Sequence, residues 1–173
     1  MIVKLVLFFG ILGSALCSFP NYQQCDSKWK NVAIGTLEVT MCQKGSLIAS
    51  VSSMLKHYGV KVDGQDADPK ALNEWLKKNK GYKNENEFVP DSIDKLKGVT
   101  YIYQLSEPLL MYAAYMLKQT CVINVNKKST WAVVTKATKD SRGNISFSVM
   151  DPALAKTSYA ANEVSLAECY VSL

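Results

Sequence analysis

The fold is decided by Lys44-Gly-Ser-Leu-Ile-Ala-Ser-Val-Ser-Ser-Met-Leu-Lys-His-Tyr-Gly59. The apolar residues of this stretch recur with the i, i+3/i+4, i+7 spacing of one helical face: Leu47, Ile48, Val51, Met54, Leu55 and Tyr58. Alanine and serines lie between them, and these residues are small enough for other backbone to approach closely. Gly45 and Ser46 provide an entry and an N-cap, and Gly59 provides a stop. The stretch therefore predicts a central helix packed against a sheet.

The first 17 residues have the pattern of a cleaved secretory signal peptide. One basic residue precedes the apolar run Leu5–Leu16, which is too short to span a membrane. Ala15 and Cys17 are small residues at positions −3 and −1 of a cleavage site before Ser18. We therefore expect residues 1–17 to be removed, and the protein to be secreted or to reside in the lumen of the secretory pathway.

The rest of the chain, residues 18–173, is expected to form one domain. Its length of ~156 residues allows a substantial core. No repeat, low-complexity block or later membrane-spanning segment is visible. The formal net charge is +5, but the lysines are scattered, and even the densest group, at Lys77, Lys78 and Lys80, favours a solvated helix end over a nucleic-acid patch. We expect neither a nucleic-acid partner nor a membrane span.

Cysteine usage agrees with an oxidising compartment. Four cysteines follow the signal peptide: Cys25, Cys42, Cys121 and Cys169. An even number indicates two disulfides with three possible pairings, and order along the chain favours Cys25 with Cys42 and Cys121 with Cys169. No Cys-x-x-Cys spacing is present, and we expect neither a metal nor a cofactor. Asn144-Ile-Ser is a glycosylation sequon in a turn-like setting, so a eukaryotic source would make the chain a glycoprotein.

The other elements are predicted from local patterns. Asp68-Pro69 is an N-cap followed by proline at the first helical position. A polar loop over 82–87 follows, and Pro90-Asp91 begins a short helix. The remaining expected elements are a strand over 99–104, a helix over 106–118, a hairpin turn over 140–144, and strands over 121–125, 131–138, 145–150 and 169–173. Helices followed by an antiparallel sheet predict an α+β domain.

Several motifs also follow one another in a characteristic order. They are Gln24-x-Asp26-x-x-Trp29, Tyr58-Gly59, Leu72-Asn73-x-Trp75-Leu76, and the strand Thr130–Thr135 followed by a turn and Asp151-Pro152. Together they resemble the papain-like peptidases related to the bacteriocin-processing (double-glycine) cysteine peptidases. The resemblance covers residues 23–152. It implies a papain-like α+β fold, in which the central helix packs on a C-terminal antiparallel sheet.

At the reactive positions this chain departs from the family that it resembles. The nucleophilic cysteine of the family falls at Ser46 and its histidine at Thr130. Asp151, which would orient that histidine, is present, and Gln24 corresponds to the oxyanion-hole glutamine. A serine hydroxyl is not appreciably ionised and needs an adjacent base, which threonine cannot supply. General-base catalysis is worth on the order of 10²–10⁴-fold, so the resemblance implies a pseudopeptidase rather than an enzyme.

Each of these residues also has an ordinary structural interpretation. Ser46 suits an N-cap, Asp151 suits a turn or a cap, Gln24 suits a tether for the N-terminal segment, and Cys42 suits a disulfide rather than a nucleophile. His57, the one histidine of the chain, lies about 16 Å along the helix from Ser46 and is expected to be exposed at the helix end. The tryptophans are expected in the core: Trp29, Trp75 and Trp131.

We therefore expect a catalytically inactive protein that works by binding. It would hold a protein or peptide partner in the former cleft, or serve as a structural subunit of a larger extracellular or lumenal assembly. The alternative is a weak peptidase or hydrolase that uses Ser46 with an unidentified base. Lysine is the only residue type available for that base, and the nearest candidates are Lys44, Lys127 and Lys128.

Overall fold

The computed structural model describes residues 18–127 and 129–173, so the predicted signal peptide over residues 1–17 lies outside it. The helices are α1 (Met41–Lys44), α2 (Ser46–His57), α3 (Pro69–Lys78) and α4 (Pro108–Met116), with 3₁₀ helices η1 (Pro90–Lys95) and η2 (Ala161–Glu163). The strands are β1 (Lys61–Val62), β2 (Gln65–Asp66), β3 (Tyr82–Lys83), β4 (Glu87–Phe88), β5 (Val99–Leu105), β6 (Thr120–Val125), β7 (Thr130–Lys139), β8 (Ile145–Met150), β9 (Ser158–Ala160) and β10 (Leu166–Ser172). None of the helices in these ranges is long and apolar enough to cross a bilayer.

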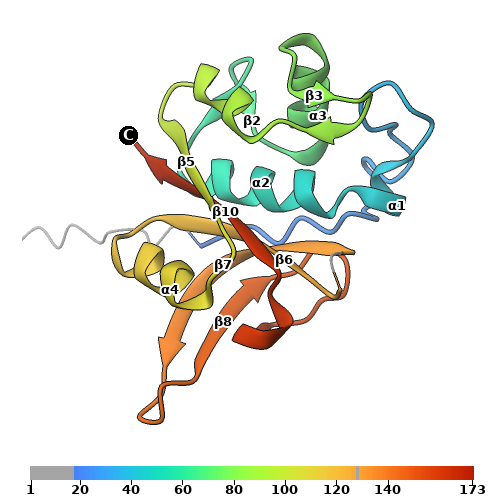
Figure 1. Ribbon diagram of the computed structural model, residues 1–173. Coiled ribbons are helices and arrows are strands. Elements are labelled where there is room, and N and C mark those ends of the chain that lie inside the picture. Colours follow the sequence, from blue (N-terminus) through green and yellow to red (C-terminus); the bar gives the residue numbers. More distant parts are fainter. Residues whose placement is uncertain (1–17, 128) are drawn as a thin grey trace, which may run out of the picture.

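Helix α2 crosses the middle of the molecule, with α3 and the short hairpins on one side and a large sheet on the other (Figure 1). The sheet has six strands in the order β5-β10-β6-β7-β8-β9, and every neighbouring pair is antiparallel. Helix α2 contacts β7 and β6 on one face of this sheet, and α4 contacts β6, β7 and β8. The α+β class and the central helix on an antiparallel sheet are thus confirmed.

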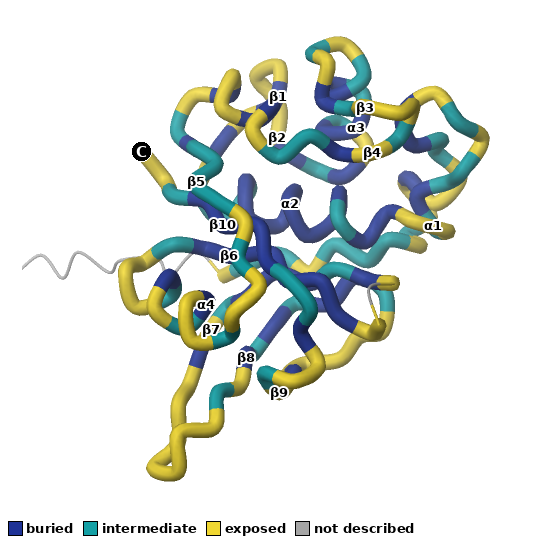
Figure 2. Tube along the Cα trace, in the orientation of Figure 1, coloured by how far each residue is buried: buried dark blue, intermediate teal, exposed yellow. Residues whose placement is uncertain are grey.

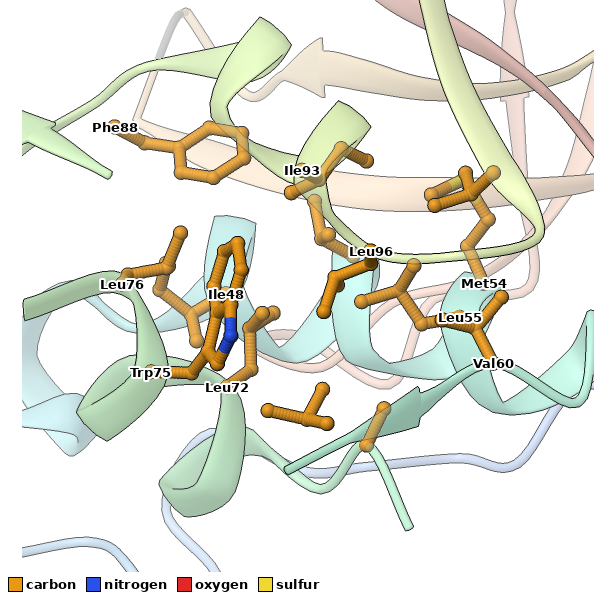
Figure 3. Close-up of a cluster of buried hydrophobic side chains, with 14 of the residues drawn as sticks. Ile48, Met54, Leu55, Val60, Leu72, Trp75, Leu76, Phe88, Ile93 and Leu96 are labelled. Atoms are coloured by element: carbon orange, nitrogen blue, oxygen red, sulfur yellow. The ribbon is translucent and has the colours of Figure 1, made fainter. Parts of the chain in front are cut away.

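Two hydrophobic cores lie on the two faces of the sheet. Alternate residues of β6 separate between them, because Val122 belongs to the core beneath α2 and Ile123 to the core beneath α4. The first core continues between α2 and α3 and includes Ile48 and Leu55 of α2 together with Leu72, Trp75 and Leu76 of α3 (Figure 3). Figure 2 shows that α2 and β6 are buried along most of their length. Helix α2 is therefore buried on both sides.

Helix α3 begins as its sequence predicts. The Asp68 carboxylate accepts a hydrogen bond from the backbone N–H of Ala71 at 2.8 Å, and Pro69 occupies the first helical position. The cap provides an acceptor for one of the free N–H groups at the helix start. Proline has no N–H, so it adds no further group that needs an acceptor. The helix then buries its apolar face in the first core through Leu72, Trp75 and Leu76.

Several sequence-based expectations are corrected. Ser46 is not an N-cap, because Gly45 holds that position and Ser46 is the first helical residue. The expected polar loop over 82–87 is instead a hairpin that includes β3 and the first residue of β4. The final strand begins at Leu166 rather than at Cys169. The first half of β10 has weak intrinsic β propensity, but its pairing with β5 and β6 on both sides holds it in the sheet.

The two disulfides are the pair expected from chain order, Cys25–Cys42 and Cys121–Cys169. Cys121 and Cys169 lie directly opposite each other on β6 and β10, and both are buried in the core beneath α4. Cys25, by contrast, is exposed in the N-terminal segment, and Cys42 is half-buried in α1. The two bridges therefore differ sharply in their access to solvent.

Mild reduction of the native protein is expected to open Cys25–Cys42 first. An attacking thiolate must reach a sulfur atom, and Cys25 is exposed whereas Cys121 and Cys169 are buried. Alkylation followed by peptide mass mapping, over a series of dithiothreitol concentrations, measures the order. Labelling of all four cysteines at the same concentration would contradict this expectation.

Candidate functional site

Hydrogen bonds connect the segments that carry Gln24, Ser46, Thr130 and Asp151, the four positions of the peptidase-like motif. Ser46, only 3 % exposed, accepts a hydrogen bond at Oγ from the backbone N–H of Trp131, the residue after Thr130, at 3.1 Å. Gln24 Nε2 donates to the carbonyl of Cys42, four residues before Ser46, at 2.8 Å. The backbone N–H of Gln24 donates to the carbonyl of Pro152, next to Asp151, at 3.0 Å. Segments far apart in the sequence thus meet around the start of α2.

The serines of α2 form the contact surface toward this site. Ser50 donates a hydrogen bond from Oγ to the Trp131 carbonyl at 3.2 Å, so Ser46 and Ser50 together hold both backbone polar groups of Trp131. One turn further along, Ser53 donates from Oγ to the carbonyl of Pro20 at 2.7 Å. These residues have i, i+4, i+7 spacing and share one helical face. Their small size allows the close approach of other backbone that the sequence predicts.

Asp151 is buried, and both oxygens of its carboxylate accept hydrogen bonds, one within its own turn and one from Tyr159 on β9. One oxygen accepts hydrogen bonds from the backbone N–H groups of Ala153 at 2.8 Å and Leu154 at 2.9 Å. The other accepts a hydrogen bond from the Tyr159 hydroxyl. Burial, together with this hydrogen bond to a carboxylate, raises the pKa of Tyr159 above its usual value. The interpretation of Asp151 as a turn residue is therefore confirmed.

Thr130 and Gln24 each bury a side-chain oxygen that has no hydrogen-bond partner among the described residues, Oγ1 of Thr130 and Oε1 of Gln24. Thr130 is the first residue of β7 and lies opposite Val125, the last residue of β6. Its hydroxyl is no proton acceptor of useful strength. Gln24 ties the N-terminal segment to α1, which agrees with its interpretation as a tether.

His57 is less exposed than the sequence predicts. It is the last residue of α2, but it is half-buried because its ring stacks on Phe19, with the ring centroids 3.8 Å apart and the planes 14° from parallel. Its Nδ1 atom is buried without a hydrogen-bond partner in the described part of the chain. His57 therefore packs against the N-terminal segment at the end of α2 remote from Ser46.

A cleft of about 930 Å³ opens where α2 begins, between the α3 side of the molecule and the sheet. Ser46 lies in its wall. The other lining residues come from α1, α2, the β3–β4 hairpin, β5, β7 and β10 and the loops beside them: Ile34, Gln43, Lys44, Leu47, Ile48, Lys83, Asn86, Glu87, Phe88, Pro90, Tyr101, Gln104, Ser129, Trp131, Leu166 and Glu168. Of the lysines considered as a base, Lys44 lines the cleft, Lys127 does not, and Lys128 lies outside the described residues.

The remaining residues singled out from the sequence lie in the core, in the cleft or at the surface. Trp29 and Trp75 are buried in the core as expected, whereas Trp131 is only partly buried and contributes to the cleft. Asn144 is exposed directly before β8, and its glycosylation stays a prediction. Within residues 18–127 and 129–173, no three His, Cys, Asp or Glu side chains gather as a metal site would require.

Sequence reasoning missed the polar cluster on the sheet side of the cleft. Glu168 on β10 and its partners Tyr101 and Gln104 on β5 come together only through strand pairing. The alternation of β10 places Glu168 and Tyr170 on the face toward α2, and this was the one available signal. The sequence predicts this strand only from Cys169 onward, so the alternation does not extend to Glu168.

Comparison with known proteins adds no relative: no family model matches the chain, and searches of curated proteins and of solved structures found no match. The papain-like interpretation therefore rests on the quoted motifs and on the geometry around Ser46.

Replacing Ser46 with alanine is expected to lower the free energy of unfolding by about 1–3 kcal/mol, because the Trp131 N–H loses its acceptor. Ser52→Ala is the matched control, since Ser52 lies on the same helix, is fully buried and has no hydrogen-bond partner among the described residues. That variant should be as stable as the parent, or more so. Urea unfolding of the three proteins measures the difference. Equal stability of all three would show that the Ser46–Trp131 hydrogen bond does not contribute to the free energy of unfolding.

Proposed function

We propose that this protein is a secreted or lumenal pseudopeptidase of papain-like fold that binds a peptide or an extended protein segment in its cleft. The observation that carries the proposal is the state of Ser46. This residue stands at the position of the family's nucleophile, it lines an open cleft, and its hydroxyl oxygen serves as the acceptor for a backbone N–H.

The papain-like part of the proposal is supported by the arrangement around α2. The motifs that resemble the family converge there through hydrogen bonds, although they come from the N-terminal segment, α2, β7 and the turn after β8. A cleft between a helical side and an antiparallel sheet, reaching the start of the central helix, is what a papain-like peptidase would need for its substrate.

The chemistry of the site supports binding without hydrolysis. Ser46 would need a base within hydrogen-bond reach to lose its proton. The hydrogen bonds of the described residues give Ser46 no such partner, and Asp151 is committed to its turn and to Tyr159. The alternative of a serine hydrolase that uses a lysine base therefore has no supporting contact in the described part of the chain.

The composition of the cleft wall suits a peptide. The volume of the cleft, about 930 Å³, is in the range of pockets that bind ligands. Both apolar side chains, such as Leu47, Phe88 and Trp131, and polar ones line the cleft. Two disulfides agree with an oxidising compartment, where secreted and lumenal proteins reside.

Incubation with a complex mixture of peptides is expected to give binding without cleavage. Peptides retained on the immobilised protein should be recovered intact, and mass spectrometry should find the same peptide termini with the parent protein and with Ser46→Ala. New termini that appear with the parent and disappear with Ser46→Ala would establish the hydrolase alternative. Absence of any retained peptide would overturn the proposed binding function.

The papain-like register is tested by rebuilding the reactive pair. In Ser46→Cys/Thr130→His, the new thiol would lie at the start of α2 beside an imidazole, and its pKa should fall below the usual value of about 8.5. The rate of alkylation by iodoacetamide against pH measures this pKa, with Ser46→Cys alone as the matched control. A double variant whose thiol titrates like that of the single variant would refute the proposed correspondence of Thr130 with the family's histidine.

A further inference from the structure

The sheet side of the cleft holds a buried carboxylate. Glu168 lies in the middle of β10, is only 4 % exposed, and lines the cleft together with Leu166, two residues earlier on the same face of the strand. On β6 its direct neighbour is Val122, which is completely buried in the core beneath α2. Glu168 therefore lies at the boundary between that core and the open cleft.

Both oxygens of Glu168 are held by neutral donors. The Tyr101 hydroxyl donates to Oε2 at 2.8 Å, and Gln104 Nε2 donates to Oε1 at 2.8 Å. The ion pairs of the described residues do not include Glu168. A carboxylate has room for about four hydrogen bonds, so acceptor capacity remains on both oxygens.

The other carboxylate of the cleft is in a different state. Glu87 is exposed on β4 and is already paired with Lys83, which also lines the cleft, at 2.9 Å. Glu168 is therefore the carboxylate of the cleft whose charge no described cation neutralises. Lys44 is an exposed cation of the wall, on α1.

A contribution to folding stability does not explain why a carboxylate is buried at position 168. Burial of a carboxylate with neutral partners carries a desolvation cost that an apolar residue beside Val122 would avoid. Residues that break the local rule for a core position are often found at functional sites, where a ligand supplies the missing interaction. The interaction missing at Glu168 is a positive charge with hydrogen-bond donors.

We infer that Glu168 recognises a basic side chain, lysine or arginine, of the peptide that occupies the cleft, an inference that rests on the proposed binding function. An ammonium or guanidinium group would donate to the free lone pairs of both oxygens. Trp131 and Leu166, which line the same cleft, would cover the methylene stem of the bound side chain. Tyr101 and Gln104 hold the carboxylate in position and act as positioning residues.

The test uses Glu168→Gln and two small probes, n-butylguanidinium and its uncharged analogue n-butylurea, with binding followed by ¹⁵N–¹H NMR shifts of cleft residues. The parent protein should bind the guanidinium probe at the cleft and prefer it over the urea. A charge-assisted hydrogen bond is worth on the order of a tenfold to hundredfold change in affinity, so Glu168→Gln should lose a preference of that size. Glu107→Gln, the matched control at an exposed glutamate that does not line the cleft, should keep it.

A second readout separates recognition from a purely structural role. In Glu168→Gln the side chain keeps its shape, and the Gln104 amide can turn to accept from the new donor, so the unfolding midpoint should stay the same or rise. A clear fall in the midpoint, or a guanidinium preference unchanged by the substitution, would overturn the inference.

Peptides from a randomised heptapeptide library distinguish failure of the inference from failure of the proposed function. Retained peptides that carry lysine or arginine at one position, with the enrichment lost in Glu168→Gln, support both. Peptides retained without any basic preference would overturn the role of Glu168 and leave the binding function intact. Loss of the guanidinium preference in Glu168→Gln, with no peptide retained by the parent, would uphold the cation site and overturn peptide binding.

Discussion

The structure depends on the contact between the serine face of α2 and the first residues of β7. Ser46 and Ser50 hold the two backbone polar groups of Trp131, and no large side chain separates the helix from the strand. The opposite face of α2 packs on α3 and η1 through the apolar core of Figure 3. Helix α2 is thus the shared element of both halves of the molecule, and the cleft opens beside its first turn.

This contact also explains how a reactive position can acquire a structural role. A residue at the start of a buried helix meets backbone groups that need partners, and Ser46 meets that need for the Trp131 N–H. Asp151 has a comparable structural role after β8, where its carboxylate organises a turn and accepts a hydrogen bond from Tyr159. In the proposed pseudopeptidase, both side chains that could take part in proton transfer are thereby occupied by the scaffold.

Local patterns predict the parts of the fold whose signals are local. Apolar periodicity predicts α2, Asp68-Pro69 predicts the start of α3, and chain order favours the observed disulfides. The parts that were missed depend on distant partners. The stacking of Phe19 on His57 joins segments far apart in sequence, the start of β10 is set by pairing on both sides, and the two-residue strands of the hairpins are too short to carry a period.

The peptidase-like positions and the Glu168 cluster lie on different elements, so a loss of catalysis would not by itself remove the Glu168 cluster. The positions that the proposed papain-like register equates with reactive residues lie at the start of α2, at the start of β7 and after β8, whereas Glu168 and its two hydrogen-bond donors lie on β10 and β5. Ser46 lines the same cleft as Glu168, Tyr101 and Gln104, but none of the described hydrogen bonds connects Ser46 or Asp151 with Glu168. In the proposed pseudopeptidase, replacement of the nucleophile and the base would therefore leave the carboxylate and its supports in place, so that recognition of a basic side chain would outlast hydrolysis.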